Sequence, residues 1–313
     1  MPAIRWGLTV PFAGVPLGEQ GALFRAAEQA GYDDLWSGET ANGHDGFTPL
    51  VVAATATERL RLVTGIVNPF TRGPGLLAQH AAALQQLSGG RFVLGLGASS
   101  DVIVERFNDI PFERPLSRVR EAVERLRPVL SVPAERGHGG LRLENPVTVP
   151  VPIVLAALRG KMLALAAEVA DGAFTNFLPI GGARTVAAAF AAPGKELACR
   201  FFWVPQPEAE GIGAARFMFA AYGSVPVYTA FFSWLGWGEQ VEPMAAAWRA
   251  GDRQRALELV PDDLVREIFL FGEAAAVRDR LRAFEEAGIT TFVLTPIAEP
   301  GALPDLMEAM APG

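Results

Sequence analysis

Short apolar runs alternate with amphipathic segments along nearly the whole chain. Each apolar run has the length of a fully buried strand, whereas the amphipathic segments repeat their apolar positions with the period of a helix. The clearest case is the stretch 88–99, in which Gly89 and Gly90 end a helix, an apolar strand follows, and small residues come directly after it. Glycine suits the helix end because it adopts the left-handed conformation at little cost.

This alternation predicts eight strands, at residues 4–10, 33–37, 60–67, 92–97, 151–156, 172–176, 197–204 and 290–295. Helices are predicted at residues 19–30, 48–58, 74–87, 117–130, 160–170 and 277–287. Two long segments, at 99–150 and 205–272, interrupt this alternation of strands and helices. The second segment is rich in aromatic residues with helical spacing. Both segments leave from the carboxyl ends of predicted strands.

Eight strands with intervening helices predict a single (β/α)8 TIM barrel spanning residues 1–313, with insertions after the fourth and seventh strands. An open, doubly wound sheet is the main alternative, because its local repeat is similar. In both folds, ligands bind beyond the carboxyl ends of the strands. We therefore expect the two insertions to shape the binding pocket.

Composition and charge argue against several classes of partner and site. The net charge of −7 argues against nucleic acid as a partner. No apolar run reaches about 18 residues and the N-terminus lacks a signal-peptide pattern, so we expect a cytoplasmic protein without a membrane partner. The single cysteine, Cys199, excludes an internal disulfide, and no Cys/His spacing predicts a metal site.

The strand ends supply the candidate ligand-binding residues. Gly97 and Ala98 leave backbone amides uncovered after the fourth strand, and polar residues stand at or just after other strands. The polar candidates are Thr9, Asn68, Ser99, Thr175 and Asn176. Their side chains can donate to carbonyl or ribityl oxygens of a flavin-like ligand, or equally satisfy nearby backbone groups.

The start of the helix after the fifth strand predicts an anion site. It is formed by Leu158, Arg159, Gly160, Lys161 and Met162. Free amides and the helix dipole attract anions there, whereas basic side chains are normally disfavoured at this end. The two basic residues therefore favour a bound anion over simple solvated side chains.

Several motifs in order resemble those of the bacterial luciferase-like monooxygenase superfamily. The matching segments are residues 35–39, 45–50, 60–66, 72–74, 87–97, 152–162, 170–172, 222–228 and 286–289. This resemblance implies a TIM barrel that binds coenzyme F420 or, alternatively, FMN, and the pattern is most similar to the F420-dependent branch. It also implies that the cofactor phosphate binds at the helix start described above, with Asn176 near the cofactor tail.

The resemblance further implies a non-prolyl cis peptide and bulge on the third strand, against the deazaflavin ring. The matching residues are Thr64, Gly65 and Ile66, with the cis bond between Gly65 and Ile66. Without the resemblance, the same residues would be interpreted as an ordinary strand with a glycine bulge. Asn68 follows directly and is counted with the cofactor-binding candidates.

The catalytic candidates are Glu39 and His44. Glu39 stands where the family places an acidic residue, but Thr40 replaces the histidine that follows it in many relatives. His44 is the alternative histidine, unless it is simply a solvent-exposed loop residue. Ala98 replaces the glutamate of sugar-phosphate dehydrogenases in this family, which argues against that reaction.

The function expected from these features is F420-dependent hydride transfer to or from a small, hydrophobic organic substrate. Two alternatives remain: an FMN-dependent monooxygenase supplied by a partner reductase, and a non-catalytic cofactor-binding protein. An aromatic set is expected to roof the site, comprising Phe217, Phe219, Tyr222, Tyr228, Phe231, Phe232, Trp234 and Trp237. By resemblance we also expect a homodimer.

Overall fold

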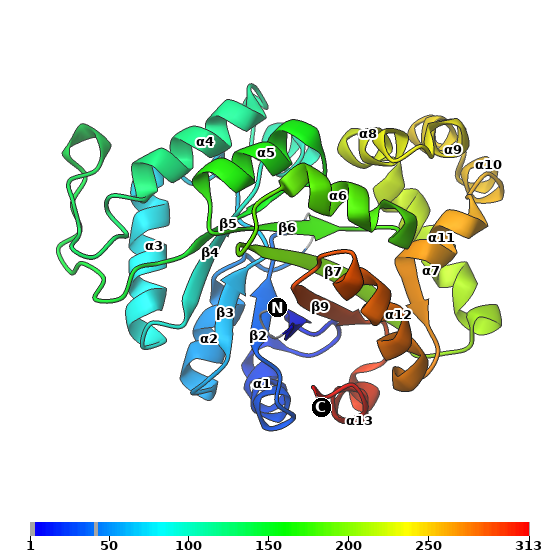
Figure 1. The fold of residues 1–313 in the computed structure, drawn as a ribbon, viewed down its shortest axis with the longest axis horizontal. Coiled ribbons are helices and arrows are strands. Elements are labelled where there is room, and N and C mark those ends of the chain that lie inside the picture. The colour runs from blue at the N-terminus through cyan, green and yellow to red at the C-terminus, as the bar shows by residue number, and fades with distance from the viewer. Residues whose placement is uncertain (1–3, 41–42, 313) are drawn as a thin grey trace.

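The computed structural model describes residues 4–40 and 43–312, and its parallel strands close into a barrel ringed by helices (Figure 1). This confirms the predicted TIM barrel. The barrel strands are β1 (Arg5–Val10), β2 (Asp34–Ser37), β3 (Arg61–Thr64), β4 (Phe92–Leu96), β5 (Ile153–Ala156), β6 (Gly172–Asn176), β7 (Glu196–Val204) and β9 (Thr291–Pro296). They pair in that order, and β9 returns to β1.

Eight helices of the described residues form the ring, and six of them lie close to predicted positions. They are α1 (Gln20–Gln29), α2 (Thr48–Ala56), α3 (Pro74–Leu87), α4 (Pro115–Leu126), α5 (Gly160–Val169), α6 (Ala183–Phe190), α12 (Ala274–Glu286) and the C-terminal α13 (Leu303–Ala309). The sequence pattern missed α6 and α13. Both are short, and alanines on both faces of α6 blur the apolar spacing that identifies a helix.

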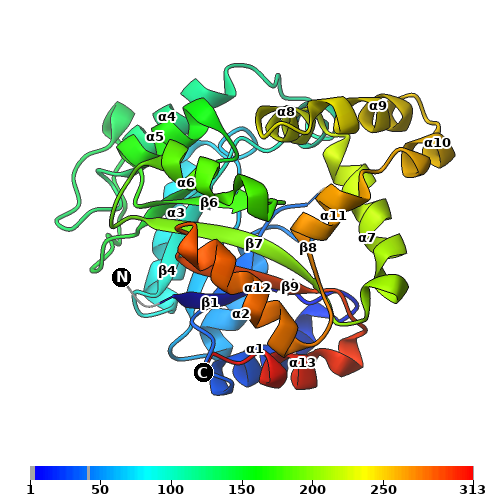
Figure 2. The ribbon, with the colours of Figure 1, turned by 45° about the vertical axis from the view of Figure 1, so that its right-hand side comes forward.

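The segment after β7 forms α7 (Glu208–Gly223), α8 (Pro226–Trp234), α9 (Gly238–Arg249), α10 (Arg253–Glu258) and α11 (Asp262–Ile268). Figure 2 shows α8, α9 and α10 grouped to one side of the barrel. The segment then adds a ninth strand, β8 (Phe269–Phe271), which pairs with residues 202–204 of β7. The sequence analysis placed these residues in a helical insertion, because three apolar residues are too few to show a strand period.

A layer of inward-facing side chains fills the middle of the barrel. Trp36 of β2 and Phe174 of β6 stack across it with their ring centroids 4.6 Å apart. Every member of the layer is at most 6% exposed, and the full set is Trp36, Val63, Val93, Val154, Phe174, Ala198 and Val293. The barrel is therefore a packed core here, and a ligand has room only beyond one of its ends.

An ionic cluster closes the amino-terminal end below this layer. The Arg61 guanidinium lies 2.7 Å from an Asp34 oxygen and 2.5 Å from a Glu196 oxygen, and Thr291 donates a 2.6 Å hydrogen bond to Glu196. Burial raises the pKa of Glu196, but hydrogen bonds from Arg61 outweigh this and hold it below its ordinary value. For the fully buried Asp34, burial dominates and raises the pKa. One arginine thus compensates two buried carboxylates.

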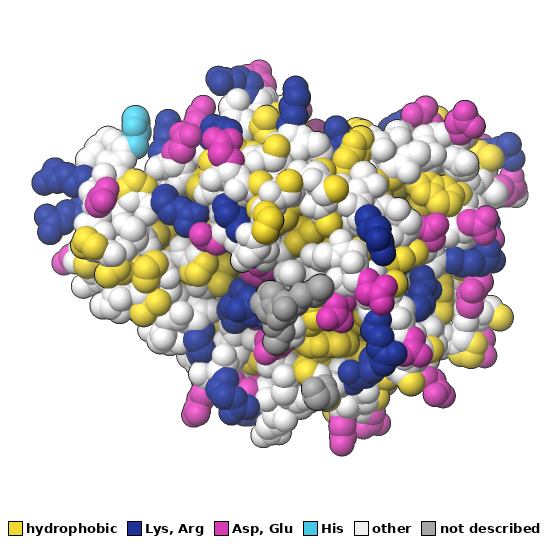
Figure 3. Space-filling view, in the orientation of Figure 1, with side chains coloured by type: hydrophobic (Ala, Val, Ile, Leu, Met, Phe, Trp, Pro, Cys, Tyr) yellow, Lys and Arg dark blue, Asp and Glu magenta, His cyan; other side chains and the backbone are white. Residues whose placement is uncertain are grey.

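Charged side chains of both signs are interspersed over the face in Figure 3. Among the helices of the described residues, none is long and apolar enough to cross a membrane.

Replacing Arg61 tests the role of the ionic cluster. R61M leaves two buried carboxylates without their cation, so we expect the free energy of unfolding to fall by about 3–5 kcal/mol in urea titrations at pH 7. The matched control is R5M, because Arg5 is half exposed and 3.9 Å from Glu196. We expect that change to be below about 1 kcal/mol. Equal losses in the two variants would contradict the assignment.

Candidate active site

The carboxyl end of the barrel, directly above the packed layer, is partly open to solvent, and we call this end the hollow. Five of the inward-facing residues one step further along the strands are only partly buried, although the packed layer beneath them is sealed from solvent. The partly exposed positions are Thr9, Ile66, Ala156, Arg200 and Thr295. Solvent therefore reaches the end of the barrel at which TIM-barrel enzymes bind their ligands.

Small and apolar residues line the side of the hollow formed by β3, β4 and β5. A Cβ atom at Gly97 would lie 2.8 Å from both Ala156 Cβ and Ile66 Cγ1. Any side chain at residue 97 would therefore displace its neighbours. The three residues form a smooth wall suited to the face of a planar ring.

The third strand ends in a bulge beside this wall. The peptide between Gly65 and Ile66 is cis, as the sequence analysis expected. Thr64 Oγ1 donates to Gly95 O at 2.9 Å and accepts from Gly95 N at 2.7 Å, while Gly65 N donates to Ser37 O. A Cβ at Gly38 would lie 2.3 Å from Gly65 O. The Thr64 hydroxyl thus replaces strand-to-strand hydrogen bonds where the bulge interrupts them.

Glu39 follows β2 at the rim of the hollow. One carboxylate oxygen pairs with Arg72, and the other accepts a 3.3 Å hydrogen bond from Asn68. The Asn68 side chain is 1% exposed, and its carbonyl oxygen accepts from the backbone of Phe70 and Thr71. Asn68 therefore fixes the loop after β3 and holds Glu39 rather than presenting its amide to the hollow.

His44 does not join this group. Its side chain is exposed, and no hydrogen bond links it to another of the described residues. The adjacent Asp45 instead accepts from the backbone nitrogens of Phe47 and Thr48 at the start of α2. The structure brings Glu39 and Asn68 together but leaves His44 in the loop.

The start of α5 is open to solvent. Arg159, Gly160 and Lys161 are exposed, whereas Leu158 and Met162 pack against the core. Gly160 has φ +40°, and no atom lies within 4 Å of a Cβ built on it. The helix has ten residues, so its first amides and dipole present a positive end beside two basic side chains.

The remaining predicted residues differ in their surroundings. Ala98 and Ser99 are partly exposed after β4, and Ser99 has φ +65°, which is unusual for a non-glycine residue. Thr175 alternates with the inward-facing Phe174 and Asn176, so it points away from the hollow. Its hydroxyl is buried without a partner.

Arg200, which the sequence analysis missed, forms a polar group with the predicted residues Asn176 and Tyr228 on the opposite side of the hollow. Arg200 of β7 donates from Nε to Asn176 Oδ1 at 3.1 Å, and Asn176 Nδ2 donates to Tyr228 Oη at 2.8 Å. The Arg200 guanidinium lies 5.0 Å from the Phe202 ring centroid. The sequence did contain a signal for Arg200, because it is the one charged residue in the predicted apolar strand at 197–204.

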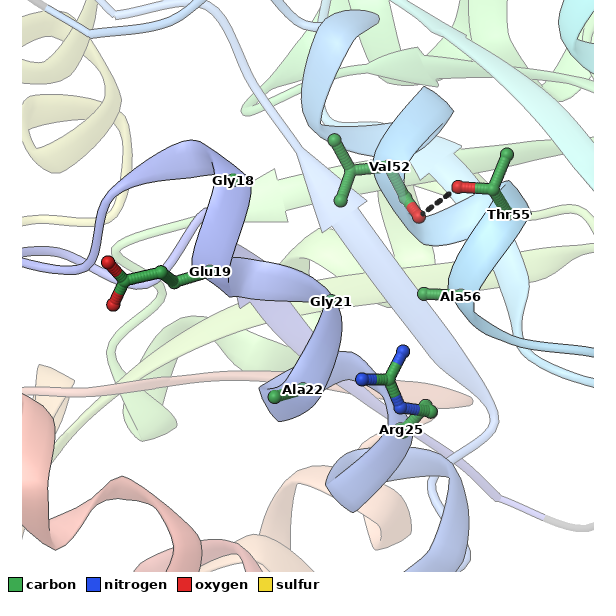
Figure 4. A pocket seen from close by; sticks show the side chains of 8 residues that line it. All are labelled: Gly18, Glu19, Gly21, Ala22, Arg25, Val52, Thr55 and Ala56. Atoms are coloured by element: carbon green, nitrogen blue, oxygen red, sulfur yellow. Dashed lines mark hydrogen bonds between the residues drawn. The ribbon is translucent and has the colours of Figure 1, made fainter.

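A separate groove of ≈ 550 Å³ lies outside the barrel, between α1 and α2 (Figure 4). Small residues line it, and Arg25 extends between the helices while Glu19 points away. The groove is shallow, and it contains none of the strand-end residues described above. We therefore place the candidate site in the hollow.

Comparison with known proteins shows the family of the chain. The family model described as luciferase-like monooxygenase matches residues 7–291. The chain belongs to the luciferase-like monooxygenase family. This confirms the family predicted from the sequence motifs, and the match includes residues of all eight barrel strands, from Gly7 in β1 to Thr291 at the start of β9.

Within the luciferase-like monooxygenase family, one similar protein is Rv3520c of Mycobacterium tuberculosis, whose name assigns it to the coenzyme F420-dependent oxidoreductases. It is 30% identical over 93% of this chain and 95% of its own. The solved F420-dependent tetrahydromethanopterin reductase of Methanopyrus kandleri superposes with a TM-score of 0.78 at 22% identity, covering 99% of this chain and 97% of its own. A third similar protein is the oxygenating constituent of 3,6-diketocamphane monooxygenase from Pseudomonas putida, solved with FMN. It superposes with a TM-score of 0.69 at 16% identity, covering 99% of this chain and 97% of its own.

The Thr64 hydroxyl provides a direct test of how the bulge is held. T64V keeps the side-chain shape but leaves the Gly95 amide and carbonyl without this partner, so we expect unfolding to become easier by about 1–3 kcal/mol. Urea titration measures the change. T64S retains the hydroxyl, and the bulge assignment would fail if it lost as much stability as T64V.

Proposed function

We propose that this chain is an F420-dependent oxidoreductase that transfers hydride to or from a small organic substrate in the hollow. The observation that carries the proposal is the smooth wall of Ile66, Gly97 and Ala156 beside the bulge on β3. The relative named for F420 dependence, similar over nearly its whole length, supports the same cofactor. When bound, F420 supplies or accepts a hydride at its deazaflavin carbon.

The residues present fit such a cofactor. A Cβ at Gly97 would clash with Ile66 and Ala156, so glycine lets these two side chains close up into a flat wall for a ring. The exposed Arg159 and Lys161 at the positive end of α5 suit the phosphate and the acidic tail. The ring-binding and tail-binding groups therefore lie on neighbouring strand ends, those of β3 to β5.

The chain's own residues would orient the ligands and exclude water. The Glu39–Arg72 pair joins the loops after β2 and β3 at the rim, beside the bulge. On the other side, Tyr222 and Tyr228 bring aromatic rings from α7 and α8 to the hollow, packed against Phe177. An apolar, partly enclosed site of this kind favours hydride transfer by holding the reactants together away from solvent.

A binding titration separates the proposed cofactor from the FMN alternative, which a solved structure of the same fold supports. The purified apo-protein is titrated with F420 and separately with FMN, following the fluorescence of each. We expect saturable quenching of F420 and none of FMN. Binding of FMN alone would replace the proposal with a flavin-dependent monooxygenase, and binding of neither would overturn both.

Removing one charge at the start of α5 tests the tail site. R159S deletes a charge-assisted contact, so we expect the Kd for F420 to rise about tenfold or more. The matched control is R282S, since Arg282 is 71% exposed on α12. An unchanged Kd in R159S, or an equal rise in both variants, would contradict the assignment.

We also propose that two copies pair through α2 and α3. Leu76 and Leu87 lie on one face of α3 and are 47% and 49% exposed, and Val51 on α2 is 43% exposed. Light scattering should give twice the mass of one chain, and the double variant L76E/L87E should give a single chain. F217E, changed at an exposed phenylalanine of α7, should still pair. A wild-type monomer would contradict the pairing.

A further inference from the structure

No ion pair within the described part of the chain neutralises the charge of Arg200. The ion pairs among the described residues involve other arginines, and no carboxylate oxygen lies within 4.0 Å of the Arg200 guanidinium. Its Nε donates to Asn176, while Nη1 and Nη2 have no hydrogen-bond partner in the described part of the chain. The polar atoms that are both sealed and unpartnered belong to Ser37, Thr175 and Asp262. Both terminal nitrogens of Arg200 therefore reach solvent in the hollow.

The hydrogen bonds around Asn176 determine whether the Tyr228 hydroxyl is free to donate a hydrogen bond. Asn176 Oδ1 accepts from both Arg200 Nε and Phe177 N, so this atom must be the oxygen. The other atom is then the NH₂ group, which donates to the Tyr228 oxygen at 2.8 Å. The Tyr228 proton is left to point elsewhere. Burial raises the pKa of Tyr228, so the phenol keeps that proton at neutral pH.

All groups that this cluster presents to the hollow are thus hydrogen-bond donors. The two guanidinium nitrogens and the phenol hydroxyl have no acceptor among the described residues, and the Asn176 side chain links Arg200 to Tyr228. The end of a guanidinium matches the two oxygens of a carboxylate, and a third donor suits one of their remaining lone pairs. We propose that Arg200, Asn176 and Tyr228 form a binding site for a carboxylate group of the substrate.

The position of the cluster favours the substrate over the acidic tail of the cofactor. Arg200 stands on β7, four strands from β3 in either direction around the barrel. It therefore faces the ring-binding wall across the hollow. It is also only two residues above Ala198 of the packed layer, whereas the basic side chains suited to the tail are exposed at α5.

This inference deepens the proposed function, and rests on it for the nature of the reaction. It replaces the expected hydrophobic substrate with an organic acid that has an apolar body. The carboxylate would bind at β7, and the reacting carbon would lie between it and the wall of Ile66, Gly97 and Ala156.

Matched charged and neutral probes test the site. Benzoate and benzamide have nearly the same shape, and their binding to the F420-loaded protein is measured by calorimetry. We expect benzoate to bind wild type about tenfold or more tightly than benzamide, and R200M to lose that preference. R200K should retain part of it, and Y228F should weaken benzoate binding while leaving benzamide unchanged. R282M, which removes an arginine that is 71% exposed on α12, is the control and should behave as wild type towards both probes.

Three results are decisive. Equal benzoate affinity in wild type and R200M, or no preference for benzoate in wild type, would overturn the carboxylate site. Retained benzoate preference in R200M with weakened F420 binding would assign Arg200 to the cofactor and overturn the substrate assignment. If wild type fails to bind F420, the probes are measured on the apo-protein. An Arg200-dependent benzoate preference would then support the site while the proposed cofactor alone fails.

Discussion

The packed layer in the middle of the barrel determines where a ligand can bind. Eight parallel strands enclose a lumen that must be filled, and Trp36 and Phe174 fill most of it by stacking across the centre. This layer separates the two ends of the barrel. The ionic cluster around Arg61 seals one end, and the residues just above the layer leave the other end open.

The size and polarity of a few inward-facing side chains determine what the open end can bind. Gly97 and Ala156 leave room on the side of β4 and β5, where the Thr64–Gly95 hydrogen bonds hold the bulge of β3. Arg200 and its partners make the opposite side polar. The hollow thus offers a flat apolar surface and a set of donors facing it, which is the arrangement needed to hold a planar cofactor and orient a charged substrate.

Much of this could be predicted from the sequence, because buried strands and amphipathic helices impose strong periods. All eight barrel strands, and the cis peptide at Gly65–Ile66 through the family resemblance, were predicted. The partners of individual side chains could not be predicted from the sequence. The pairing of Glu39 with Arg72, for example, depends on how two loops meet. Arg200 was missed because its lack of a carboxylate partner is visible only once the neighbours are in place. The three-residue β8 was missed because it is too short to show a period.

The central claim is that the ring of F420 binds in the hollow at the carboxyl end of the barrel. A crystal structure of the protein with F420 tests it most directly. We expect density for the deazaflavin ring against Ile66, Gly97 and Ala156, with the acidic tail leading towards Arg159 and Lys161. Density for F420 in the groove between α1 and α2, or a ring lying against Arg200 with the apolar wall uncovered, would contradict it.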